Sequence, residues 1–183
     1  MSLQLPDELL DLEANGGIFA VWMLMQNCAI QVDIQTLVQL CKHDSEDGTF
    51  TIGLAVGLKK LGFDVVFHTA EDPNIHFKEI EHYTEANRLG LAIEQPLTYQ
   101  DIQTNIEQGY AIVVYYDTLE GIGNHSLVYS IDDQEICFYD SFDPMEKNIF
   151  EQQCRAEDPI QLTLRSISSL QIETHKEEVL NYN

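Results

Sequence analysis

Basic residues are scarce in this chain. Its 183 residues include 31 aspartates and glutamates but only 9 lysines and arginines, for a formal net charge of −22. Such a surface repels phosphate backbones and anionic lipids, which argues against direct binding to nucleic acid or to a membrane. The acidic residues are spread along the whole chain. We therefore interpret the charge mainly as a solubility feature, with attraction of a basic partner as the sharper alternative.

Long apolar runs and targeting signals are also missing. No stretch approaches the ~20 consecutive apolar residues that span a bilayer. The first residues are acidic, whereas a secretory signal begins with basic ones. The sequence therefore predicts a cytoplasmic protein.

Metal-binding spacings are absent as well. The four cysteines have no CxxC spacing, and the six histidines form no HExxH motif. We expect reduced core thiols, no metal and no cofactor. The histidines outside the motifs discussed below are expected at the surface: His68, His76, His82 and His175.

What is present is a regular series of apolar segments, helical first and extended later. The 3.6-residue spacing predicts helices over 18–28, 33–41 and 50–61, with two shorter ones over 77–89 and 98–108. Runs rich in β-branched and aromatic residues predict strands over 63–68, 110–116, 125–131, 135–139 and 160–164. This order predicts one α+β domain over 1–183 with two lobes: a helical N-terminal lobe, about 1–62, packed on an antiparallel β-sheet lobe, about 63–172.

Several short motifs follow one another in an ordered way. Asn15-Gly16-Gly17 opens the first helix, and Gly48-Thr49-Phe50 precedes the third. Asn124-His125-Ser126 starts a strand, and Tyr139-Asp140-Ser141 ends the next one, shortly before Asp143-Pro144. Asn15 is a residue type that caps helix N-termini well.

This order resembles the papain-like cysteine peptidases, and within them the branch of the double-glycine bacteriocin-leader peptidases. The similarity covers roughly residues 12–145. It implies that Gly16 stands at the position of the nucleophilic cysteine, with His125 as general base and Asp140 as the carboxylate that orients it. Asp143 is the alternative carboxylate. Asn15, Gly17, Asn124 and Asp143 are the implied binding residues.

The departures from this pattern decide the functional prediction. Gly16 has no side chain, so no thiolate and no acyl-enzyme can form there. The family also places an oxyanion-donating glutamine about six residues before the cysteine, where this chain has Leu10. Two lost roles indicate a pseudopeptidase that binds a peptide or protein segment, basic if the charge selects it, in the former active-site cleft.

Two other functions stay open from the sequence. The chain fits an active thiol peptidase or amide-bond transferase whose nucleophile has been replaced at Gly16. It also fits an acidic antagonist or regulatory protein that mimics a polyanion. A reactive Gly16→Cys thiol would favour the first, and binding to a nucleic-acid-handling enzyme would favour the second.

Overall fold

The fold combines helices and one mixed sheet, and the computed structural model describes residues 4–70, 75–141, 143–156 and 160–167. Its helices are α1 Asp7–Leu10, α2 Gly16–Asn27, α3 Ile34–Leu40, α4 Thr51–Lys60, α5 Glu79–Arg88, α6 Tyr99–Glu107 and α7 Lys147–Ala156. Its strands are β1 Phe63–His68, β2 Ala92–Glu94, β3 Ala111–Asp117, β4 Gly123–Ile131, β5 Glu135–Phe138, β6 Met145–Glu146 and β7 Ile160–Ile167.

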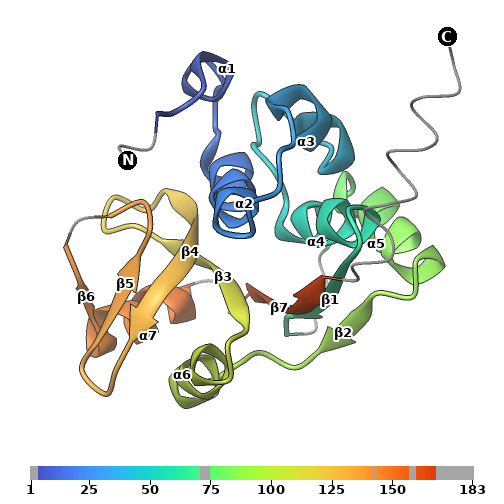
Figure 1. Cartoon of the computed structure of the whole chain (residues 1–183). Coiled ribbons are helices and arrows are strands. Elements are labelled where there is room, and N and C mark those ends of the chain that lie inside the picture. The colour runs from blue at the N-terminus through green and yellow to red at the C-terminus, as the bar shows by residue number, and fades with distance from the viewer. Residues whose placement is uncertain (1–3, 71–74, 142, 157–159, 168–183) are drawn as a thin grey trace, which may run out of the picture.

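The seven strands form one sheet in the order β2-β1-β7-β3-β4-β5-β6 (Figure 1). Every pairing is antiparallel except β1 with β2, which run parallel. The last described strand, β7, lies between β1 and β3, so the C-terminal part of the chain joins the two halves of the sheet. The expected α+β fold is confirmed, although the strand over 160–164 extends to Ile167 and residues 168–172 lie outside the described part.

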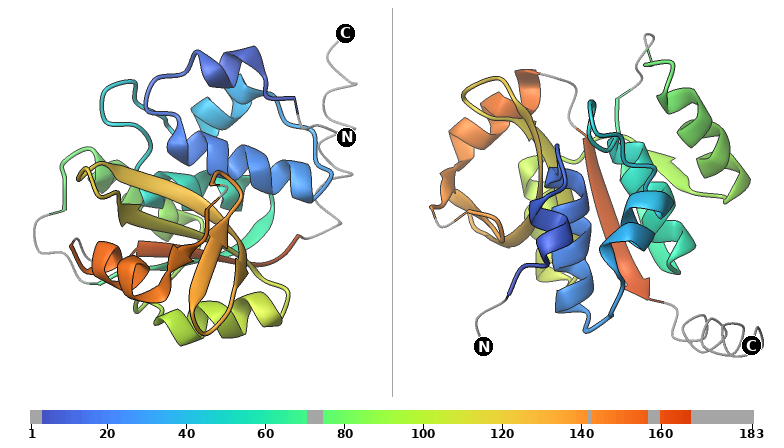
Figure 2. Two further views of the ribbon diagram at one scale, coloured as in Figure 1. Left: turned by 90° about the vertical axis from the view of Figure 1, so that its left-hand side faces the viewer. Right: turned by 90° about the horizontal axis from the view of Figure 1, so that it is seen from above.

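Helices cover both faces of this sheet, as the two views of Figure 2 show. The α2, α3 and α4 helices lie on one face, with α5 packed against α4, and α6 and α7 lie on the other. Alternate residues of β3 serve the two layers, because neighbours in a strand point to opposite sides. Val113 belongs to the core under α2 and α4, whereas Ile112 and Val114 belong to the core under α6 and α7.

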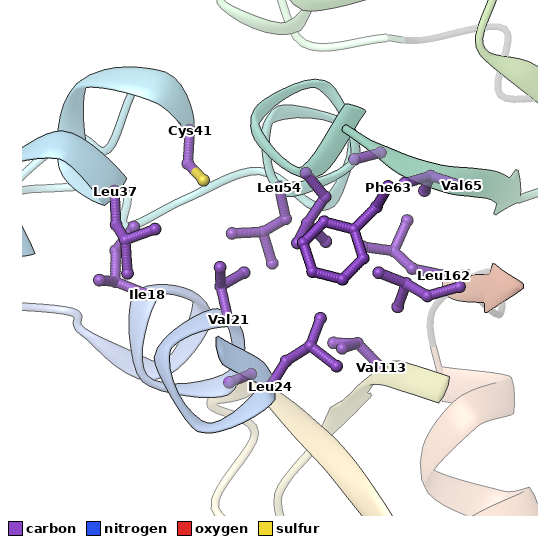
Figure 3. Packing of buried hydrophobic residues seen from close by; sticks show 14 of the residues in the cluster. Ile18, Val21, Leu24, Leu37, Cys41, Leu54, Phe63, Val65, Val113 and Leu162 are labelled. Carbon is purple, nitrogen blue, oxygen red and sulfur yellow. The ribbon is translucent and has the colours of Figure 1, made fainter. Parts of the chain in front are cut away.

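The larger core surrounds α2 (Figure 3). Ile18, Val21 and Leu24 of this helix are at most 2% exposed, and the run from Ile18 to Met25 is apolar on every face. Residues from α3, α4, β1, β3 and β7 close around them, among them Leu37, Cys41, Leu54, Phe63, Val65, Val113 and Leu162. This burial holds the N-terminus of α2 in a fixed place beside the sheet.

Local chemistry at the helix ends differs partly from expectation. Asn15 precedes α2 but its side chain does not cap the helix; its Nδ2 donates to the Leu9 carbonyl at 2.8 Å instead. Asp33 and Thr98 do cap α3 and α6 through their side chains. At the end of α4, Gly62 has φ +91°, a conformation that glycine adopts without strain.

Two histidines expected at the surface are buried. His68 is 3% exposed and hydrogen-bonds the Gln95 carbonyl and the Thr163 hydroxyl, so its ring is satisfied inside the sheet. His82 is 5% exposed and lies against α4 at Gly53. His76 is exposed as expected, and His175 lies outside the described residues.

Candidate functional site

A cleft of about 1030 Å³ opens where the N-termini of α2 and α4 meet the start of β4. Its floor and sides come mainly from four parts of the chain that are distant in the sequence: the α2 start, the loop before α4, the first half of α5 with the residues just before it, and the β3–β4 hairpin. The residues around it include Asn15, Gly16, Gly17, Glu46, Asp47, Thr49, Phe50, Thr51, Ile75, Glu79, Tyr83, Tyr115, Ile122, Gly123, Asn124 and His125. The motifs singled out in the sequence therefore converge on one cleft.

Position 16 lies at the first residue of α2 and faces Asn124. A Cβ placed on Gly16 would lie 3.0 Å from Asn124 Oδ1 and 3.8 Å from the His125 backbone nitrogen. Apart from its chain neighbours, the Asn124 amide is the only described side chain within 4 Å of that point. A side chain at position 16 would press on this amide, so the missing side chain and the amide fit each other.

Asn124 is oriented by three acceptors on its far side. Its Nδ2 lies within hydrogen-bonding distance of the Tyr116 hydroxyl (3.2 Å), Ser126 Oγ (3.1 Å) and Asp140 Oδ2 (3.4 Å), so its two N–H groups are shared among three acceptors. Ser126 Oγ donates to the same carboxylate oxygen at 2.8 Å. Because an ionised carboxylate only accepts, the amide nitrogen points toward Asp140 and the amide oxygen toward Gly16.

His125 points away from this network. Its Nε2 shares a 2.8 Å hydrogen bond with Thr51 Oγ1 at the start of α4, and its ring lies 4.9 Å from the ring of Tyr115, its cross-strand partner. The ring is 8% exposed, and burial lowers its pKa from 6.5 to about 4. His125 is therefore a neutral imidazole at physiological pH.

These contacts correct the expected arrangement of the histidine and the carboxylate. The sequence predicted that Asp140 orients His125, but Asp140 contacts Ser126 and Asn124 while His125 contacts Thr51. The physical reason is strand alternation: adjacent residues of β4 send their side chains to opposite sides. Because side chains alternate, a shift of one residue in the alignment puts Asn124, and not His125, at the strand position that faces residue 16.

The other predicted site residues differ in their relation to the cleft. Gly17 is buried, and a Cβ there would approach Thr49 Cβ to 3.2 Å, so this glycine lets α2 pack closely on the segment before α4. Asn15 lines the cleft while its side chain holds Leu9. Asp143 is exposed outside the cleft lining, where its carbonyl accepts from Ser141 Oγ at 3.0 Å.

Several functional neighbours were not found from the sequence. Thr51 and Tyr115 flank His125, and Tyr116 and Ser126 hold Asn124. The pairing of β3 with β4 reveals the two tyrosines, because it places Tyr115 opposite His125 and Tyr116 opposite Asn124. Thr51 reaches His125 from α4, a contact that only the packing of that helix on the sheet creates. Leu10, at the spacing of the oxyanion glutamine, is 59% exposed at the end of α1 and does not line the cleft.

The cysteines do not offer a substitute nucleophile near this point. Cys41 and Cys154 are buried, and burial raises the pKa of each thiol to about 12. Cys28 lies at the other end of α2, and burial raises its pKa as well. Within the described residues, no group of three or more histidine, cysteine or acidic side chains is arranged to hold a metal ion.

The arrangement of helices around this sheet is the α+β fold of the papain-like peptidases. Among solved structures, the peptidase domain of ComA from Streptococcus, a bifunctional ABC transporter involved in a quorum-sensing pathway, matches with a TM-score of 0.52. The match covers 89% of this chain and 96% of that one at 16% sequence identity, so it shows a shared fold. No protein-family model and no curated protein matches the sequence. None of the helices in the described part of the chain is long and apolar enough to cross a membrane.

Proposed function

We propose that this chain is a pseudopeptidase, which binds a peptide or protein segment in its cleft and does not hydrolyse it. The observation that carries the proposal is the pair formed by Gly16 and Asn124. Gly16 offers no atom that could attack a carbonyl carbon, and the side chain facing it is an amide. An amide is not a general base at physiological pH, so both the nucleophile and its activating group are missing.

The remaining ionisable groups support the same conclusion. His125 is neutral and hydrogen-bonded to Thr51, so no imidazolium is present to stabilise a thiolate at position 16. Asp140 keeps its place behind Asn124, where it accepts from an amide and a hydroxyl. Of the three catalytic positions that the resemblance implies, only Asp140 still orients a neighbouring side chain, and that side chain is the Asn124 amide.

The cleft itself supports a binding role. Its volume of about 1030 Å³ is at the upper end of the range for ligand sites in proteins. Its walls combine glycine backbone at Gly16 and Gly123 with the aromatic rings of Phe50 and Tyr115. Exposed backbone can hydrogen-bond an extended peptide, and flat rings can contact its side chains. Because the segment is not hydrolysed, it leaves the cleft intact and only by dissociation.

We also place the protein in the cytoplasm. The support is chemical: four cysteines are present and all are free thiols, which is typical of a reducing compartment.

The proposal is tested by incubating the protein with short peptides of random sequence and identifying both retained peptides and cleavage products by mass spectrometry. The wild-type chain should retain a subset of intact peptides. Ile122→Ser, which removes apolar surface at the cleft wall without changing the charge, should reduce that retention at least about fivefold. Leu119→Ser is the matched control, since Leu119 lies on the same hairpin, is 87% exposed and does not line the cleft.

Three results would contradict the proposal. Cleavage products would show an active peptidase. Failure to retain any peptide would remove the binding role. Equal loss of retention in the Ile122 and Leu119 variants would place the binding surface outside the cleft.

A further inference from the structure

The geometry points to a particular class of occupant, and this inference rests on the proposed function. We infer that the cleft selects an extended segment that carries lysine or arginine side chains alternating with apolar ones.

The charged side chains that line the cleft are all acidic, and His125, which also lines it, is neutral. Glu46 and Asp47 come from the loop before α4, and Glu79 comes from the first turn of α5. No lysine or arginine lines the cleft in the described part of the chain. A concave wall of one charge sign concentrates the electric field, so it favours a cationic ligand more than the same charges would on a flat surface.

The rim of the cleft already binds an ammonium group. Lys78 Nζ donates to Asp47 Oδ2 and, at 3.3 Å, to Asp44 Oδ2. Backbone N–H groups of Asp47 and Glu46 donate to Asp44 and lower its pKa to about 2, so this carboxylate stays ionised. The hydrogen bond to Asp47 is the main reason why the pKa of Lys78 is raised. Asp47 is thus already paired with Lys78 inside the protein, so a ligand cation would meet the other two acidic residues of the cleft wall, Glu46 and Glu79.

Apolar residues flank the acidic wall on two sides. Ile75 and Phe50 lie toward α5, and Ile122 lies on the β3–β4 hairpin. Ile75 is 40% exposed and Ile122 is 60% exposed, so both present apolar surface to solvent. Successive side chains of an extended peptide point to opposite sides, and a peptide that alternates apolar and cationic residues can therefore meet both kinds of wall.

The test uses three fluorescent peptides of equal length that alternate leucine with lysine, glutamine or glutamate. Their affinities are measured by anisotropy for the wild-type chain and for Glu46→Gln/Glu79→Gln. Glutamine keeps an acceptor for the hydrogen bond that the His76 N–H donates to Glu79. The matched control is Glu94→Gln/Glu107→Gln, which changes the net charge equally at two exposed residues outside the cleft.

We expect the lysine peptide to bind at least about tenfold more tightly than the glutamine peptide, with an affinity that falls as NaCl rises. The cleft variant should lose about tenfold for the lysine peptide only, and the control variant should lose less than about twofold. Equal affinity for the lysine and glutamine peptides, or equal losses in both variants, would overturn the inference while leaving peptide binding intact. Binding of none of the three peptides, together with no retention from the random set, would overturn both the inference and the proposed function.

Discussion

At the scale of single residues, Gly16 and Asn124 define the character of the site. The Asn124 amide occupies the space next to position 16 and is fixed there by Tyr116, Ser126 and Asp140. A cysteine introduced at position 16 would meet this amide and not an imidazole. Any thiolate there would be stabilised by the N-terminus of α2 alone.

The first prediction concerns the reactivity of such a thiol. Gly16→Cys should react with iodoacetamide slowly near neutral pH. Gly16→Cys/Asn124→His should react at least about tenfold faster, because an imidazole beside the sulfur, with Asp140 behind it, lowers the thiol pKa. Alkylation rates of the variants are measured by mass spectrometry against the wild-type chain, whose own cysteines give the background. A Gly16→Cys single variant that reacts as fast as the double variant would contradict this prediction.

The second prediction concerns His125 and pH. Its pKa of about 4 in the folded state lies below the ordinary 6.5, so in this window the unfolded chain binds a proton that the folded chain does not. The contribution to stability is therefore complete above about pH 6.5 and is lost as the pH falls toward 4. The wild-type free energy of unfolding should drop by about 2–3 kcal/mol more than that of His125→Gln between about pH 7.5 and about pH 4.5. Urea denaturation at both pH values measures this difference, and identical drops would contradict the assignment.

At the scale of elements, α4 has a glycine face that allows α3 to approach. A Cβ on Gly57 would overlap Cys41 Sγ, and a Cβ on Gly53 would lie 2.7 Å from the Cys41 carbonyl oxygen. The apolar stripe of α4, which includes Leu54 and Leu58, was visible in the sequence. The glycines one turn apart beside it have a packing role that only the fold reveals.

The third prediction uses these glycines in a double-mutant cycle. In an exposed helix, replacing glycine by alanine stabilises by about 1 kcal/mol. Here Gly57→Ala should instead destabilise by about 2 kcal/mol because of overpacking. Cys41→Ala should relieve that clash, since the nearest atom is its sulfur, with a coupling of about 1 kcal/mol or more.

Gly53→Ala provides the control for this cycle. Its nearest contact is the backbone oxygen of residue 41, which remains in Cys41→Ala. Its coupling with Cys41→Ala should stay below about 0.5 kcal/mol in urea denaturation. Equal couplings for the two glycines would contradict the proposed contacts.

Elements with strong apolar patterns were predicted well, and the two shorter helices predicted over 77–89 and 98–108 are present as α5 and α6, whereas α7 and β2 were missed. The helices around 18–28, 33–41 and 50–61 and the strand 63–68 appear within one or two residues of expectation. The α7 helix was not predicted, because Phe150 and Cys154 are the only buried apolar residues among those of its side chains that the structure describes. The β2 strand has three residues, all exposed, and gives no alternating pattern.

At the scale of the whole molecule, one sheet with helices on both faces brings distant segments to a common cleft. The same space is lined by four parts of the chain that are separated by dozens of residues: the α2 start, the loop before α4, the first half of α5 with the residues just before it, and the β3–β4 hairpin. The whole chain carries a net charge of −22. Of its acidic side chains, we expect those that line the cleft to have the largest effect on the affinity for a ligand.

The sequence by itself determined two features. The residue type at position 16 excludes a thiol nucleophile there, and the all-apolar run after it requires a buried helix, because such a surface is unfavourable in water. Tertiary structure alone decided which side chain faces Gly16. Asn124 and His125 are adjacent, and the pairing of β4 with β3 sends them to opposite sides of the sheet, so the amide reaches Gly16 while the imidazole is held by Thr51.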